Sequence, residues 1–170
     1  MAAARSGQLE KLKLLRENNT LWDGGTCAGA AQEGYLEELK WARANGCPWD
    51  TNACSLAASQ GHLKILKWLF LNDAPVDTET IWQALGRGNL EMLEILRANG
   101  APWDAFTCAT AAQLGQLEAL KWLRKNGCPW DERTILRANE GEFDDIATLA
   151  KANGAPVPQR TVSFGFTMFF

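Results

Sequence analysis

Glycine recurs in this chain at a fixed interval of 27 residues, and this feature restricts the possible folds more than any other. The series comprises Gly7, Gly34, Gly61, Gly88 and Gly115, and it ends at Gly141 after a step of 26. Two further series with the 27-residue period comprise Gly46, Asp73, Gly100, Gly127 and Gly154, and Pro48, Pro75, Pro102, Pro129 and Pro156. Three registers that agree indicate tandem structural repeats, with one residue lost from the last repeat.

The segment between Gly34 and Gly46 is predicted to form a helix, here called helix B. Leu36, Leu39 and Ala42 lie at positions i, i+3 and i+6, which places them on one face of a helix. Gly46 can adopt the positive φ that ends a helix, and a proline follows two residues later. The same pattern recurs in every repeat.

A second helix, helix A, is predicted from the small residues that precede each turn glycine. Cys27, Ala30 and Ala31 form one such stretch, and their size would let neighbouring helices approach closely as an inner layer. An aspartate precedes each stretch, at Asp23, Asp50, Asp77, Asp104 and Asp131. Because an aspartate side chain can accept hydrogen bonds from the free N–H groups of a first helical turn, we expect these residues to be N-caps.

A single pair of helices cannot bury its apolar face, so the repeats must stack. The sequence therefore predicts an all-α solenoid of helix-turn-helix repeats. Residues 1–157 are expected to form the array, with about six units and a partial first unit. Residues 158–170 are expected to form an apolar C-terminal tail or a partial seventh unit, because Thr161 and Val162 align with Thr134 and Ile135.

The cysteines and tryptophans occupy repeat positions that other units fill with aliphatic residues, so we interpret both as packing residues. Ile81 stands in the column of Cys54, and Val76 stands in the column of Trp49. Trp82 is the exception, because it stands in the column of Ala28, Ser55, Ala109 and Leu136 and is expected to be partly exposed. An odd number of cysteines, no C-x-x-C spacing and a single histidine, His62, argue against a metal site.

Several classes of function are not expected. His62 stands where other units have serine, tyrosine, asparagine or glutamine, so it is not a general base, and neither an enzyme activity nor a cofactor is predicted. A net charge of -3 provides no basic field for nucleic acid. No apolar run approaches the roughly 20 residues that span a bilayer, and the start lacks an apolar signal core. A cytoplasmic or nuclear protein is therefore expected.

Three stretches together resemble the ankyrin repeat: GHLKILKWL at residues 61–69, NGCPWD at 45–50 and TCATAA at 107–112. The resemblance covers nearly the whole chain. Ankyrin repeats usually have 33 residues, so a 27-residue repeat implies a shorter helix A and a trimmed hairpin loop. Short, tryptophan-rich arrays of this kind look like the divergent ankyrin proteins of giant DNA viruses and some protists, which would place a viral protein in its host cell.

The ankyrin resemblance implies a partner-binding concave face formed by helix A and the adjoining loops. Two helix A columns and the positions after the capping aspartate vary between units while their neighbours repeat. The predicted partner-binding residues in these columns are Leu56, Gln83, Arg87, Phe106, Thr110, Leu114, Arg137, Glu79 and Arg133. A charge placed at such a variable position is expected to change the stability by less than about 0.5 kcal/mol.

The leading hypothesis is a non-enzymatic, monomeric scaffold that binds a protein partner. The alternative is a substrate-recruiting module of a ubiquitin-ligase-type machine, whose docking element would lie outside this chain. Nucleic-acid binding ranks third, because the predicted face mixes Glu79 and Glu132 with Arg87 and Arg133. Neutral drift on a solvated surface would also produce variable columns.

Overall fold

The computed structural model describes residues 9–10, 12–14, 16–17 and 23–159, and every regular element in these residues is an α-helix. The first helix A and the tail from residue 160 onward lie outside the described residues. The helices of type A are α2 (Gly24–Gln32), α4 (Thr51–Gln60), α6 (Thr78–Arg87), α8 (Ala105–Gln113) and α10 (Glu132–Glu140). Those of type B are α3 (Leu36–Ala44), α5 (Leu63–Leu71), α7 (Leu90–Ala98), α9 (Leu117–Lys125) and α11 (Asp144–Ala152).

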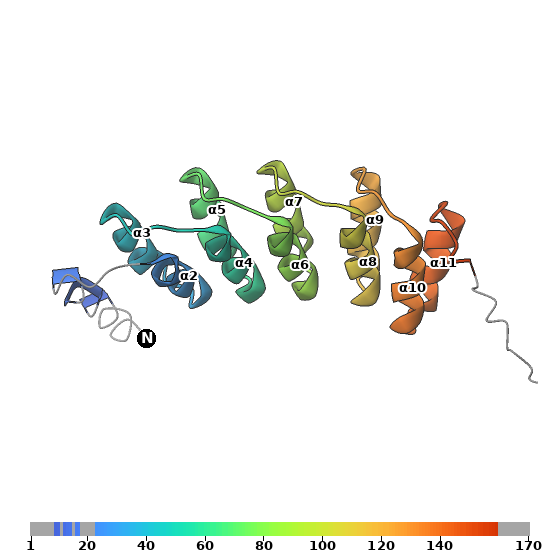
Figure 1. Cartoon of the computed structure of the whole chain (residues 1–170), viewed down its shortest axis with the longest axis horizontal. Helices are drawn as coiled ribbons and strands as arrows, with labels where there is room; N and C mark the ends of the chain where they lie inside the picture. Colours follow the sequence, from blue (N-terminus) through green and yellow to red (C-terminus); the bar gives the residue numbers. More distant parts are fainter. Residues whose placement is uncertain (1–8, 11, 15, 18–22, 160–170) are drawn as a thin grey trace, which may run out of the picture.

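The helix pairs stand side by side in a gently arched row, which confirms the predicted all-α repeat solenoid (Figure 1). Each helix A packs against the helix A of the next repeat, from α2 through to α10, and each helix B packs on the helix A of its own repeat. The A helices lie on the inner side of the arch and the B helices on the outer side (Figure 1). The contact pattern confirms the inner layer that the small residues predicted.

Aspartates begin the A helices as predicted. The carboxylates of Asp50, Asp77, Asp104 and Asp131 each accept a hydrogen bond from a backbone N–H in the first turn, at distances of 2.9–3.2 Å. Asp23 holds the same place before α2, but its side chain makes no capping hydrogen bond. Each cap satisfies one of the N–H groups that a helix leaves without an intrahelical partner.

The predicted loss of one residue from the last repeat is wrong. Helices α9 and α11 begin at Leu117 and Asp144, so the 27-residue period continues to the end of the described array. Gly141 has φ -87°, whereas the next residue, Glu142, has φ 61° and takes the left-handed position of Gly115. The glycine series therefore ends one residue early because a non-glycine residue occupies the turn.

Replacing Glu142 with glycine is expected to stabilise the protein by about 1 kcal/mol. A left-handed conformation costs an L-residue with a Cβ about 1–2 kcal/mol, and the greater freedom of glycine in the unfolded chain offsets part of the gain. Urea unfolding measures the change. Asp73→Gly should give a smaller gain at φ 58°, because aspartate tolerates this conformation better than glutamate. Equal or reversed gains would contradict this explanation of the turn.

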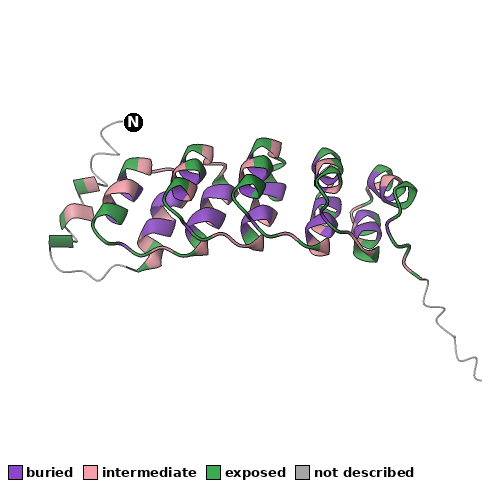
Figure 2. Cartoon of the chain, turned by 90° about the horizontal axis from the view of Figure 1, so that it is seen from above, coloured by how far each residue is buried: buried purple, intermediate pink, exposed green. Residues whose placement is uncertain are grey.

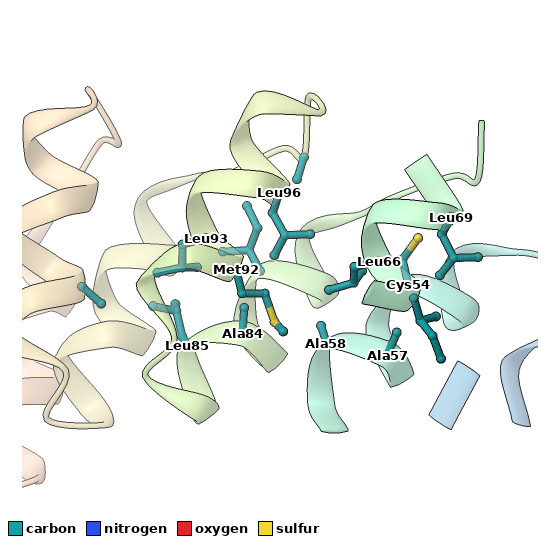
Figure 3. Packing of buried hydrophobic residues seen from close by; sticks show 14 of the residues in the cluster. Cys54, Ala57, Ala58, Leu66, Leu69, Ala84, Leu85, Met92, Leu93 and Leu96 are labelled. Atoms are coloured by element: carbon teal, nitrogen blue, oxygen red, sulfur yellow. The ribbon is translucent and has the colours of Figure 1, made fainter. Parts of the chain in front are cut away.

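The core is a continuous layer between the A and B helices, shown in purple in Figure 2. Small residues such as Ala57 and Ala58 come from the A helices, and large ones such as Leu66, Leu93 and Leu96 come from the B helices (Figure 3). Each repeat therefore buries one face against the preceding repeat and the opposite face against the following repeat. Stability in such an array depends on every interface along the row.

The inner helices α6 and α8 are less closely packed than the other adjacent inner pairs (Figure 1). At this interface Trp82 stands where the other described units have alanine, serine or leucine, and the fully buried Leu85 stands where three of the four others have alanine. Large side chains between two helices increase their separation, because interaxial distance follows the residues at the contact. The seam between α6 and α8 is therefore the irregular one in the described row.

Candidate partner-binding face

The predicted partner-binding residues lie on the A helices α4, α6, α8 and α10, with Leu114 at the C-terminal end of α8. Along α6, α8 and α10 they are spaced four residues apart, which places them on one face of each helix. All of them are exposed or half-buried. The structure thus brings these columns together on the A helices, which lie on the inner side of the arch (Figure 1).

An aromatic cluster bridges three inner helices at this face. The rings of Trp82 on α6 and Phe106 on α8 meet edge to face, with centroids 5.2 Å apart and an interplanar angle of 70°. The guanidinium of Arg133 on α10 lies 5.6 Å from the centroid of the Phe106 ring. Edge-to-face aromatic pairs and cations over rings are both favourable contacts.

The structure corrects the expectation that a charge at Phe106 leaves the stability unchanged. Phe106 is half-buried and packs on Trp82 in the seam between α6 and α8. A charged replacement would remove the ring contact and place a carboxylate against the indole. Phe106 is therefore a structural residue as well as a candidate contact residue.

Arg87 also has a structural role. Its Nε donates to the backbone oxygen of Ser59 at 2.5 Å, and one of its terminal nitrogens donates to the side-chain oxygen of Gln60 at 3.2 Å. These bonds join α6 to the end of α4. A charge reversal at Arg87 would break this link, so we expect it to lower the stability more than the variable column alone predicts.

Three other predicted residues are engaged within their own repeat. Gln83 donates to the carboxylate of Glu79 at 2.5 Å, and Arg137 forms an ion pair with the carboxylate of Glu140 at 2.9 Å. The hydroxyl of Thr110 donates a hydrogen bond of 2.9 Å to the backbone oxygen of Phe106. Exposed pairs of this kind contribute little to stability, so these side chains remain adaptable surface groups.

Arg133 is held by Asp131 through two side-chain hydrogen bonds of 2.6 and 2.8 Å. The guanidinium lowers the pKa of the Asp131 carboxyl below its usual value, chiefly through these hydrogen bonds. Because this carboxylate faces Arg133, the hydroxyl of Thr134 has no partner, whereas Thr80 and Thr107 bond to their capping aspartates. The interaction orients the guanidinium toward Phe106.

Leu56 and Leu114 supply the aliphatic part of the inner face. Leu114 is 43% exposed, which is unusual for a large apolar side chain that lies beside well-packed repeats. In the other repeats its position carries glutamate, glutamine, arginine or glycine. The position therefore does not require an apolar residue for folding, which makes Leu114 the clearest candidate contact residue.

All five cysteines are buried and unpaired, in agreement with their interpretation as packing residues. Cys27 lies beside Cys47, and Cys108 lies beside Cys128, each 20 residues apart along the chain. Comparing only cysteines in the same column missed these pairs, because they form between the inner helix and the following loop. Burial raises the pKa of Cys54 to about 12 and also raises the pKa of Cys27, so these thiols are not reactive nucleophiles.

The outer side of the array carries a repeated stack that sequence reasoning missed. The guanidinium groups of Arg43, Arg97 and Arg124 lie 4.0–4.2 Å from the ring centroids of Trp49, Trp103 and Trp130. Two of these tryptophans also meet a tryptophan of the next helix B edge to face. The i, i+6 spacing of arginine and tryptophan was the available signal. These stacks seal the loops over the core, so the tryptophans are packing residues as predicted.

Within the described residues, no group of three or more histidine, cysteine, aspartate or glutamate side chains could hold a metal ion. In the same part of the chain, no helix is both long and apolar enough to cross a membrane. The sequence matches no known family model and no curated protein significantly.

Proposed function

We propose that this chain is a non-enzymatic scaffold of the ankyrin class, which binds a protein partner through the inner face of its A helices. One observation carries the proposal: the residues that vary between otherwise regular repeats share this face, and they surround the Trp82–Phe106 pair. Aromatic, arginine and leucine side chains of this kind supply most anchor residues in protein interfaces.

The charges of the inner face support a protein rather than a nucleic acid as the partner. Arg87, Arg133 and Arg137 alternate with Glu79 and with the capping aspartates, so no basic stripe runs along the face. We further propose that the chain acts as a monomer in the cytoplasm or the nucleus, and that it needs no cofactor.

The test separates binding from stability by exchanging residues between repeats. Gln83→Arg and Leu114→Glu together introduce the residues that Arg137 and Glu33 supply at the same repeat positions. Neither Gln83 nor Leu114 joins two repeats through a side-chain hydrogen bond, so the stability is expected to change by less than about 0.5 kcal/mol. Affinity capture with mass spectrometry is expected to show that this double variant loses the partner of the parent protein.

The matched control changes the outer face. Lys40→Glu and Lys121→Glu introduce the residue that Glu94 supplies at this position, and each removes an exposed ion pair of 2.8 or 2.6 Å with a neighbouring glutamate. This variant should fold and should retain the partner. The proposal would be contradicted if the outer-face variant lost the partner and the inner-face variant retained it.

A further inference from the structure

A cavity of about 600 Å³ lies at the edge of the array where the turns between helices A and B meet. Its walls come from the A–B turns, the first turns of α3 and α5, and Leu9 of the first unit, so it shares no residue with the predicted partner-binding face. The apolar walls are Tyr35, Leu36, Leu63 and Ile65. This volume falls within the range of roughly 300–1,000 Å³ that is typical of small-molecule sites.

One wall of the cavity is an acidic residue in a core position. Glu38 is 4% exposed, and the same column holds Ile65, Met92, Ala119 and Ile146, all buried, in the other described repeats. Among the residues that the structure describes, Glu38 is the only acidic or basic residue in the buried class. This substitution places a carboxylate beside the cavity, where the other described repeats have an apolar side chain.

The Glu38 carboxylate has no hydrogen bond and no ion pair in the described part of the chain. In the same part, the only fully enclosed side-chain polar atoms without a partner are Trp82 Nε1 and Thr134 Oγ1. The Glu38 oxygens therefore retain access to solvent, although the rest of the residue is buried. Because Glu38 lines the cavity, an entering group can reach this carboxylate.

Among the described residues, no neighbouring group forms an ion pair with Glu38. Glu37 is paired with Lys40 at 2.8 Å and faces solvent. Lys64 lines the cavity but forms no ion pair within the described residues. Glu38 belongs to the first turn of α3, where the helix dipole favours a negative charge without pairing with it.

His62 lines the same cavity. Its Nε2 lies 2.9 Å from the backbone oxygen of Gln32, and because a carbonyl oxygen can only accept, Nε2 carries the hydrogen. In a neutral imidazole Nδ1 is then an acceptor. The cavity thus combines a carboxylate, an imidazole acceptor, the aromatic ring of Tyr35 and an apolar wall.

We propose that this cavity binds an organic cation with an apolar stem, such as an alkylammonium or alkylguanidinium group. Glu38 would pair with the charge, His62 would accept one of its hydrogens, and the ring of Tyr35 would face the cation. Leu36 and Leu63 would contact the stem. An organic cation fits better than a metal ion, because the described residues provide no group of three metal ligands here.

Isothermal titration calorimetry of the full chain with n-butylammonium tests the proposal, with n-butanol as the neutral analogue of the same shape. The ammonium is expected to bind and the alcohol is not. Glu38→Gln should weaken ammonium binding about tenfold or more, since a hydrogen-bonded charge pair is lost. Glu118→Gln, an exposed glutamate on α9 far along the row, should leave it unchanged. No binding of the ammonium, or equal binding by Glu38→Gln, would overturn the proposal.

A second variant keeps the result independent of folding. Glu38→Ile introduces the residue that α5 and α11 have at this position, so it should raise the Tm while it abolishes ammonium binding. Lys64→Gln should tighten binding, because it removes a like charge from the cavity wall. If Lys64→Gln instead lowers the Tm and Glu38→Gln cancels that loss, the two residues form an internal pair and the proposal is wrong.

The source of the cation is decided by a parallel titration with Nα-acetyl-lysine methylamide. Tighter binding than n-butylammonium identifies the ligand as a lysine side chain of a polypeptide, whereas weaker binding identifies it as a free amine. Both results support a cation site. The outcome is independent of the capture experiment on the inner face, because no residue is shared between the two surfaces.

Discussion

Replacing Leu93 with alanine is expected to lower the free energy of unfolding by about 2–5 kcal/mol. Leu93 is 2% exposed and belongs to the core cluster that continues through α5, α6 and α7. Its truncation leaves a cavity in the middle of the row, where the neighbouring helices cannot all close the gap. Because each repeat contacts only its neighbours, the weakened interface should also separate the thermal transition into two steps.

Leu71→Ala is the matched control for Leu93→Ala, because it makes the same chemical change at a side chain that is 82% exposed. Its unfolding free energy should change by no more than about 0.5 kcal/mol. Urea denaturation followed by circular dichroism measures both variants. Equal stabilities of the Leu93 and Leu71 variants would show that α7 does not face the core as the structure describes.

Gly115→Ala is expected to have the second largest effect, for two separable reasons. The residue has φ 68°, so an alanine there is strained by about 1–2 kcal/mol. An added Cβ would also lie 2.6 Å from ring atoms of Phe143, an overlap that typically costs a further 1–3 kcal/mol. Thermal unfolding should show that Gly115→Ala lowers the stability more than an alanine at a turn glycine without this overlap. The aromatic ring cannot move aside without disturbing the next repeat.

Gly100→Ala isolates the strain from the overlap. Gly100 has φ 80°, but an added Cβ there meets no atom within 4 Å. A second comparison uses the variant Phe143→Asn. It introduces the residue that Asn89 supplies at the equivalent position after Gly61, where an added Cβ would meet no atom within 4 Å. In that background Gly115→Ala should cost no more than Gly100→Ala. Equal losses in the parent protein would show that the Phe143 ring does not cover Gly115.

Sequence comparison predicted which positions lie on the inner face, but not which residues their side chains contact. Sequence comparison between repeats placed Leu56, Gln83 and Leu114 on a variable surface, and they are accessible there. It also treated Phe106 and Arg87 as free surface positions, although each contacts a neighbouring repeat. The partners of these side chains come from another repeat, so the residue types within one column could not reveal them.

The cavity at Glu38 illustrates the same limit. The sequence shows a glutamate where the next unit has Ile65, but an isolated acidic residue near a helix start is usually solvated. Only the stacking of α3 on its neighbours shows that this residue is 4% exposed and lines a cavity together with His62. Burial is a property of the surroundings, and those surroundings come from two repeats.

The helix boundaries, the aspartate caps and the division into inner and outer helices follow from the sequence, because these features depend on interactions within a few residues. The turn glycines alone gave the wrong frame for the last repeat, since Glu142 adopts a conformation that glycine usually marks, although Gly154 and Pro156 keep the 27-residue step. Packing over the whole repeat holds Glu142 there against its local preference. The wide seam at Trp82, the Cys27–Cys47 contact and the burial of Glu38 likewise depend on how one repeat sits on the next. Tertiary structure decided these features, because contacts between stacked repeats depend on side-chain volume and orientation, which the 27-residue spacing does not specify.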